Sequence, residues 1–319
     1  MTARARRIIS VAAGKGGVGK SIIAANLAVS FAQDGKRVLL VDADLGSPNL
    51  HTLMGIDVVR VGLDAFLARG GTLEASSVPT MVPGLSLVPG AFQGDAANLA
   101  PPLRRHLVEA IKAADVDVVV LDVGAGTGAA TIELFLAADQ RALVMVPQLP
   151  SVQNAYLFLK AAMFTLLRQI ADAAGESSAI TDVFPRDLGK LVTALATLRA
   201  KRPALAARIT SALAGHGVVI IGNQVVDPSG LATIEAMTRM IRDYLAITPA
   251  VIGALHASPA ARASVDERVP FVLDPGATRL TNELRRVATS LLSVDVGPLR
   301  EARAGRPTSP PSQPLGHRM

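Results

Sequence analysis

Eight residues near the start of the chain, Gly14 to Ser21, have the sequence GKGGVGKS. They match the pattern GxxxxGK[ST], in which the backbone N–H groups of a glycine-rich turn surround phosphate oxygens. The pattern directly follows one apolar segment, 8–13, and directly precedes a second, 22–31. A strand before the turn and a helix after it would point the positive end of the helix dipole at the bound anion. The sequence therefore predicts a site for a nucleoside triphosphate.

The side chains at the end of this loop have distinct predicted contacts. Lys20 can reach the β- and γ-phosphates, and Ser21 can coordinate Mg²⁺. The other residues predicted to contact the nucleotide here are Gly14, Gly16, Gly17, Val18, Gly19 and Ile22. The alternative is that the glycines only form a tight turn, but the Lys-Ser pair and the helix that follows favour phosphate binding.

Asp122 directly follows the apolar run 117–121, which reads as a buried strand. Ligands of open α/β sheets bind at the carboxyl ends of the strands, so we expect this carboxylate beside the phosphate loop. There it can hold the coordination shell of Mg²⁺. The alternative is that Asp122 only caps the next helix.

Asp42 and Asp44 end another apolar segment, 36–42, in the string VDADLGSPNLH. A carboxylate at this position could order an attacking water or bind the metal through water. The alternative is turn formation, because Asp, Gly, Ser and Pro all favour turns. Position alone leaves these two interpretations open.

Lys15 is a second lysine within the loop. Its cation would lie close to the phosphates of its own nucleotide, or it could be donated to the nucleotide of a partner chain. The alternative is a solvated surface lysine, and the sequence alone leaves the choice open.

Strand-like and helix-like segments alternate along the chain, which predicts an α/β fold with a mostly parallel, doubly wound sheet flanked by helices. We expect one domain over 1–295, with a helical insert at 176–215 and a disordered Pro/Arg-rich tail at 296–319. The helix at 151–174 is the clearest, with Ser151 as its cap and Gly175 at its end. The other expected strands are 85–88, 142–146, 217–222 and 249–255, and the other expected helices are 103–114, 229–245 and 276–292.

Composition excludes several classes of site. The 319 residues include no cysteine, which excludes disulfides, thiolate zinc sites and cysteine-ligated iron–sulfur clusters. No apolar run is long enough to span a bilayer, and we expect a cytoplasmic protein. The formal net charge of +6 permits a weak attraction to DNA or to an anionic membrane surface. The alternative is that the arginines are simply solvated.

Five strings, in this order, resemble the motifs of the MinD/ParA family of ATPases. GKGGVGKS, with lysine after the first glycine, resembles its deviant Walker A motif. VDADLGSPNLHTLMG and VVVLDVGAGTG resemble its second motif and its Walker B and switch II region. VMVPQLPSVQNAYLFLKAA and IIGNQV resemble the strand and helix that follow and the adenine-contacting strand end. The resemblance covers about 7–292 with a gap at 176–215, and is greatest to the MinD-like branch that includes FlhG, the flagellar-number regulator.

The resemblance implies a P-loop NTPase fold of the SIMIBI type and a site for ATP and Mg²⁺. Lys15 would cross a sandwich dimer to the partner's ATP, and Asp44 would position the hydrolytic water. Asp42 and Asp122 would lie near the metal, together with Ser21, and Asn223 would contact adenine.

The resemblance also implies a slow ATPase, stimulated by a partner protein, that forms an ATP-dependent homodimer. Such a switch would regulate the position or number of a flagellum or division site, either in the cytoplasm or peripheral to membrane or nucleoid. The 296–319 tail contains no apolar stripe, so we do not expect a membrane-binding amphipathic helix there. The family's iron–sulfur members need cysteines and are excluded.

Two other functions remain open from the sequence. The first is a ParA-like partitioning ATPase that binds DNA non-specifically. Its candidate phosphate-binding residues are Arg199, Lys201, Arg202, Arg208, Arg239 and Arg242. The second is a non-enzymic binding module, against which the intact set of loop lysines and strand-end carboxylates argues.

Overall fold

The computed structural model describes residues 7–90, 99–183, 191–215 and 217–293. The predicted tail at 296–319 lies outside these residues, as do the first six residues of the chain. Among the described residues, no helix combines the length and the apolar character needed to cross a membrane.

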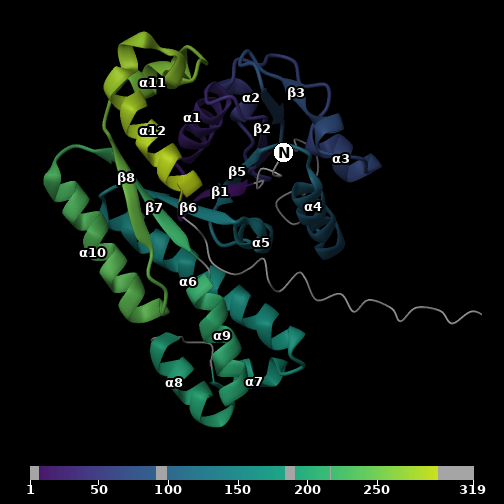
Figure 1. Cartoon of the computed structure of the whole chain (residues 1–319), viewed down its shortest axis with the longest axis vertical. Helices are drawn as coiled ribbons and strands as arrows, with labels where there is room; N and C mark the ends of the chain where they lie inside the picture. The colour runs from purple at the N-terminus through teal and green to yellow at the C-terminus, as the bar shows by residue number, and fades with distance from the viewer. Residues whose placement is uncertain (1–6, 91–98, 184–190, 216, 294–319) are drawn as a thin grey trace, which may run out of the picture.

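An eight-stranded sheet forms the centre of the molecule, in the order β3-β4-β2-β5-β1-β6-β7-β8 (Figure 1). All neighbouring strands are parallel except β3 and β4. Four of these strands, β2, β5, β6 and β7, each contain four consecutive apolar residues, as expected where helices cover both faces of a sheet. The strands are β1 (Arg7–Ala13), β2 (Val38–Ala43), β3 (Val78–Pro79), β4 (Leu85–Val88), β5 (Val118–Ala125), β6 (Gln140–Met145), β7 (Val218–Val225) and β8 (Ala250–His256).

Helices lie on both sides of this sheet, so the predicted α/β fold class is confirmed. The core on one side includes residues of α1, α2 and α12, and the core on the other side includes residues of α4, α5, α6 and α10. The helices are α1 (Lys20–Gln33), α2 (Leu50–Leu53), α3 (Leu63–Arg69), α4 (Pro101–Ala113), α5 (Ala129–Ala137), α6 (Leu149–Ala173), α7 (Ser177–Val183), α8 (Leu191–Lys201), α9 (Pro203–Gly215), α10 (Pro228–Leu245), α11 (Pro259–Asp266) and α12 (Thr278–Ser293).

Helices α7, α8 and α9 form a group beyond the end of the sheet (Figure 1). They pack on α6 and α10 through buried side chains that include Leu198, Leu205 and Ile209. α8 and α9 are separate helices, because Pro203 begins α9 and cannot continue α8.

The beginning of α6 differs from the prediction. Ser151 does not cap the helix, which begins at Leu149 with Pro150 in its first turn. The Ser151 hydroxyl is buried and accepts a hydrogen bond from the backbone N–H of Val146, at 3.2 Å. Ser151 therefore holds the turn between β6 and α6. Gly175 follows the last turn with φ of 71°, a conformation that suits glycine at a helix end.

Candidate functional site

The glycine-rich loop lies between β1 and α1, at the carboxyl edge of the sheet. Gly17 and Gly19 have φ of 80° and 86°, in the left-handed region that glycine adopts without strain. A Cβ built on Gly16 or Gly17 would meet no atom within 4 Å. The loop is therefore exposed and uncrowded at these two glycines.

A pocket of about 390 Å³ opens above this loop. Six of the residues that the sequence predicted to contact nucleotide, and both predicted catalytic residues, line it. They are Lys15, Gly16, Gly17, Gly19, Lys20, Ser21, Ile22 and Asp44. The remaining lining residues are Ser47, Asn49, Leu53, Ala125, Gln224 and Val265. The other predicted residues, Gly14, Val18, Asp42, Asp122 and Asn223, lie behind this lining or outside it.

Lys20 is the centre of the charged cluster. Its Nζ lies 2.6 Å from Asp122 Oδ1 and 3.4 Å from Asp44 Oδ2, and its side chain is only 7% exposed. Burial lowers the pKa of the Lys20 ammonium, but the Asp122 and Asp44 carboxylates raise it by more, so that it lies above its ordinary value. The ammonium therefore stays charged at neutral pH and is available to an incoming phosphate.

Asp122 is completely buried at the end of β5. Its Oδ1 accepts from Lys20, whereas its Oδ2 has no hydrogen-bond partner among the described residues. Burial raises the pKa of this carboxyl above its ordinary value, and the Lys20 ammonium works in the opposite direction. Burying a carboxylate oxygen without a partner costs free energy. This oxygen can therefore accept a further cation or an ordered water as its partner.

The chemistry of the donor set fits Mg²⁺. Among the described residues, no three or more His, Asp or Glu side chains are arranged to hold a metal ion on their own. Mg²⁺ sites that serve nucleotides commonly use one or two protein oxygens, with water and phosphate as the other ligands. Ser21, in the pocket lining, and Asp122 supply such oxygens.

Asp42 has a different position. Its Oδ2 accepts from the backbone N–H groups of Asn49 and Leu50, each at 2.9 Å, and its Oδ1 accepts from Asp44 N–H at 3.3 Å. Burial, and then the Asp122 carboxylate, raise the pKa of Asp42 to about 7. In this structure Asp42 fixes the loop that carries Asp44 and begins α2. Its predicted contact with a metal stays a prediction.

Asn223 lies at the end of β7, and its Nδ2 donates to the Val18 carbonyl at 2.8 Å. A Cβ on Gly19 would come within 2.4 Å of the same Nδ2. The amide therefore braces the glycine-rich loop from below. The predicted contact with adenine stays a prediction.

Gly14 provides a direct test of how closely the loop packs. A Cβ there would lie 2.2 Å from the backbone carbon of Asn154, whereas a Cβ on Gly16 meets nothing within 4 Å. We therefore expect Gly14→Ala to displace the loop and lower the free energy of unfolding by about 2–4 kcal/mol. Gly16→Ala, the matched control, should change it by less than about 1 kcal/mol.

Urea unfolding without nucleotide measures both variants. Equal stabilities for the two alanine variants would contradict the close packing of Gly14 on α6.

Several lining residues were not predicted. Ser47, Asn49 and Leu53 belong to the string VDADLGSPNLHTLMG, in which the polar turn residues Ser47 and Asn49 could have been predicted as part of the site. Gln224 has a φ of 53°, uncommon for a residue other than glycine, and follows the predicted Asn223. Val265 gives no sequence signal, since only the tertiary structure brings α11 to the pocket.

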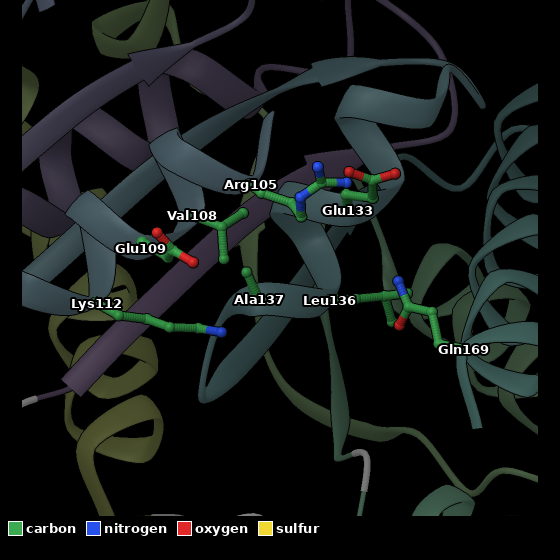
Figure 2. A pocket seen from close by; sticks show the side chains of 8 residues that line it. All are labelled: Arg105, Val108, Glu109, Lys112, Glu133, Leu136, Ala137 and Gln169. Atoms are coloured by element: carbon green, nitrogen blue, oxygen red, sulfur yellow. The ribbon is translucent and has the colours of Figure 1, made fainter. Parts of the chain in front are cut away.

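A second hollow, of about 320 Å³, lies on the α4–α5 side of the molecule (Figure 2). Its walls come from α4, α5 and α6, and Figure 2 shows both positive and negative side chains around it. The lining residues are Arg105, Val108, Glu109, Lys112, Glu133, Leu136, Ala137 and Gln169. None of them belongs to the predicted site, so the pocket above the glycine-rich loop is the candidate functional site.

The six basic residues considered for DNA binding are all exposed, but they are spread over three helices and the junction between α8 and α9. Arg199 and Lys201 lie at the end of α8, Arg202 follows it, Arg208 lies on α9, and Arg239 and Arg242 lie on α10. Arg202 lies 3.8 Å from Glu176, and Arg242 lies 3.5 Å from Asp243. Neighbouring carboxylates thus neutralise part of this charge.

Comparison with known proteins agrees with this geometry. The ParA family model, described as the NUBPL iron-transfer P-loop NTPase, matches residues 4–167. The matched segment includes the glycine-rich loop, Asp44 and Asp122. The absence of cysteine means that the chain offers no thiolate ligand for iron.

Curated relatives include antiactivator FleN of Pseudomonas aeruginosa, 34% identical over 158 residues, which are 48% of this chain and 55% of that protein. The flagellum site-determining protein YlxH of Helicobacter pylori is 33% identical over 157 residues, covering 48% of this chain and 53% of YlxH. The septum site-determining protein MinD of Synechocystis is 34% identical over 152 residues, covering 47% of this chain and 56% of MinD. The chain thus spans about half the length of the curated relatives it matches.

Solved structures resemble the chain over most of its length. The cell division ATPase MinD of Pyrococcus furiosus aligns with a TM-score of 0.62 and 20% identity, covering 90% of this chain and 99% of that one. MinD of Pyrococcus horikoshii, complexed with Mg-ADP, aligns with a TM-score of 0.60 and 21% identity, covering 89% and 95%. At this identity the likeness shows the fold, while the family model gives the family. The chain belongs to the MinD/ParA family of P-loop NTPases, whose model matches it over residues 4–167.

Proposed function

We propose that the protein binds ATP with Mg²⁺ above the Gly14–Ser21 loop and hydrolyses it to ADP and phosphate. The observation that carries this proposal is the position of Lys20, a buried ammonium between Asp122 and Asp44 at the floor of an open pocket. A bound triphosphate would offer Lys20 a stronger anionic partner than either carboxylate. The related MinD of Pyrococcus horikoshii, solved with Mg-ADP, supports the choice of ligand.

Each side chain then has a definite task. The open N–H groups at Gly16 and Gly17 bind phosphate oxygens, and Lys20 binds the β- and γ-phosphates. Ser21 and Asp122 hold Mg²⁺, which neutralises charge on the transferred phosphoryl group when bound. Asp44 is 18% exposed and lines the pocket, where its carboxylate orients the attacking water and accepts its proton.

We also propose that ATP brings two copies of the chain together at this edge of the sheet. Lys15 is partly exposed at the lining of the pocket, where its ammonium can reach the phosphates held by a facing copy. Two large apolar side chains are exposed after the adjacent strands β6 and β7: Leu149, at the start of α6, at 68%, and Val226, directly after β7, at 82%. A facing copy would cover these two side chains and remove their apolar surface from water.

The names of the relatives suggest the cellular role. FleN is an antiactivator, YlxH determines a flagellum site, and MinD determines a septum site. We propose a switch in the cytoplasm that regulates the position or number of a flagellum or division site, anchored to membrane or nucleoid. A protein partner would speed its slow hydrolysis. A MinC:MinD complex is known from Aquifex aeolicus, which supports the proposal of a partner.

The release of phosphate from ATP by the purified chain tests the enzymic proposal. We expect slow turnover with Mg²⁺ that stops on addition of EDTA. A single-turnover assay in which bound ATP stays intact, with or without candidate partners, would instead favour a non-enzymic binding module.

A second candidate function is ParA-like binding of DNA without sequence preference. The exposed Arg199 and Lys201, beside Arg202, favour it because they form a basic group at the junction of α8 and α9. Binding of DNA that requires ATP and falls steeply with salt would support this function. No binding at low salt would remove it.

A further inference from the structure

Arg268 joins two segments of the chain that lie more than two hundred residues apart in sequence. It lies two residues beyond the end of α11, and its Nε donates to the Thr52 carbonyl at 3.2 Å. Its Nη1 donates to Asp57 Oδ1 at 2.5 Å. One side chain thus holds both α2 and the segment that follows α2.

Both joined segments contribute to the wall of the candidate site. Asn49 and Leu53, at the two ends of α2, line the pocket, and so does Val265 of α11. The Asn49 wall is continuous with Asp44, because Asp42 binds the N–H groups of both segments. Movement of α2 would therefore be passed to the carboxylate proposed to orient water.

The backbone of Arg268 has a conformation that glycine adopts more readily than arginine. Its φ is 58°, in the left-handed region, directly after the C-cap residue Glu267. This conformation costs a non-glycine residue about 1–2 kcal/mol, and glycine is the residue usually found in it at the end of a helix. Strain retained beside a binding pocket is a reason to look for a function of the side chain.

A simple stabilising role does not explain this arrangement. Asp57 is 76% exposed and Arg268 is 37% exposed. Ion pairs between such exposed groups contribute little to stability, because water and salt screen them. The free energy gained from the ion pair would scarcely offset the strain of the backbone. We therefore look for the role of the contact in the two segments that it joins.

We propose that Arg268 is a positioning residue that couples the α11 wall of the nucleotide pocket to the Asp44–Leu53 wall. A ligand that contacts Val265 and Leu53 would then set the position of Asp44 through Arg268 and α2. This inference rests on the proposed ATPase function, and it adds a residue outside every predicted motif. Coupling between sites through such contacts has a typical size of about threefold to thirtyfold in rate or affinity.

Arg268→Gly is the sharpest test, because it removes the side chain and relieves the backbone strain at once. We expect kcat for ATP to fall about threefold to tenfold, while the free energy of unfolding in urea stays the same or rises. Arg268→Lys, which can keep one contact, should recover part of the rate. Arg262→Ala, which removes an exposed arginine from the neighbouring α11, is the matched control and should leave the rate unchanged.

A double-mutant cycle with Asp57→Ala separates the coupling from loss of charge. The effects of Arg268→Gly and Asp57→Ala should be less than additive, because both remove the same contact. Wild-type rates in Arg268→Gly, or a loss matched by Arg262→Ala, would overturn the proposal.

Hydrogen exchange of the nucleotide-free protein distinguishes failure of this inference from failure of the proposed function. We expect the amides of 50–57 to exchange faster in Arg268→Gly than in the parent chain, since local opening frees them. If exchange is faster in Arg268→Gly but the parent chain hydrolyses no ATP, the ATPase proposal is refuted while the structural link made by Arg268 stands. Unchanged exchange would refute the coupling, whatever the activity.

Discussion

Replacing Lys20 with alanine is expected to lower ATP hydrolysis at least about a hundredfold, because the cation that binds the β- and γ-phosphates is removed. The same change leaves Asp122 buried without its counter-ion, at the end of β5. Removing one partner of a buried ion pair costs about 3–5 kcal/mol of stability. We therefore expect Lys20→Ala to lose both activity and free energy of unfolding.

The double variant Lys20→Ala, Asp122→Asn separates these two effects. It should regain much of the stability, since the uncompensated carboxylate is gone, but none of the activity. Phosphate release and urea unfolding measure the two quantities. A Lys20→Ala chain that hydrolyses ATP at the parent rate would remove Lys20 from the proposed mechanism.

Asp44→Asn should have the second largest effect, on hydrolysis alone. We expect kcat to fall about a hundredfold to ten-thousandfold, because an amide cannot accept the proton of an attacking water. The asparagine oxygen can still accept from Ser47 N–H, the 3.2 Å bond that Asp44 Oδ1 makes, so the loop should keep its path. Nucleotide affinity should change by less than about fivefold.

Calorimetry with ATP and a single-turnover assay measure affinity and hydrolysis separately. The expected outcome is a chain that retains ATP without cleaving it. Equal losses of affinity and rate would contradict the account, since they would assign Asp44 to ground-state binding.

The fold and the phosphate loop were predictable because their signals are local. A strand, a glycine-rich turn and a helix follow one another within 7–33, and the pattern of each depends only on its neighbours in sequence. Asp122 could be predicted beside the loop because parallel strands end at the same edge of a sheet. The pairing of Asp42 with Asp122 across β2 and β5 follows the same logic.

The rest required the tertiary structure. The sequence predicted Ser151 as a helix cap. Its hydroxyl instead accepts from Val146 N–H in the turn between β6 and α6, and the sequence pattern does not reveal that contact. The carboxylate of Asp42 binds amides up to eight residues away, through a loop path that periodicity cannot give. Val265 lines the pocket and Arg268 contacts Thr52 from a part of the chain where no motif marks them.

Sedimentation velocity of the purified chain tests the central proposal most directly, namely that two copies close on bound ATP. With Mg²⁺ and a non-hydrolysable ATP analogue, the account predicts a species of twice the monomer mass. With ADP, or with Lys15→Ala and the analogue, it predicts monomers. A parent chain that stays monomeric at saturating analogue, while calorimetry shows the nucleotide bound, would contradict the proposed switch.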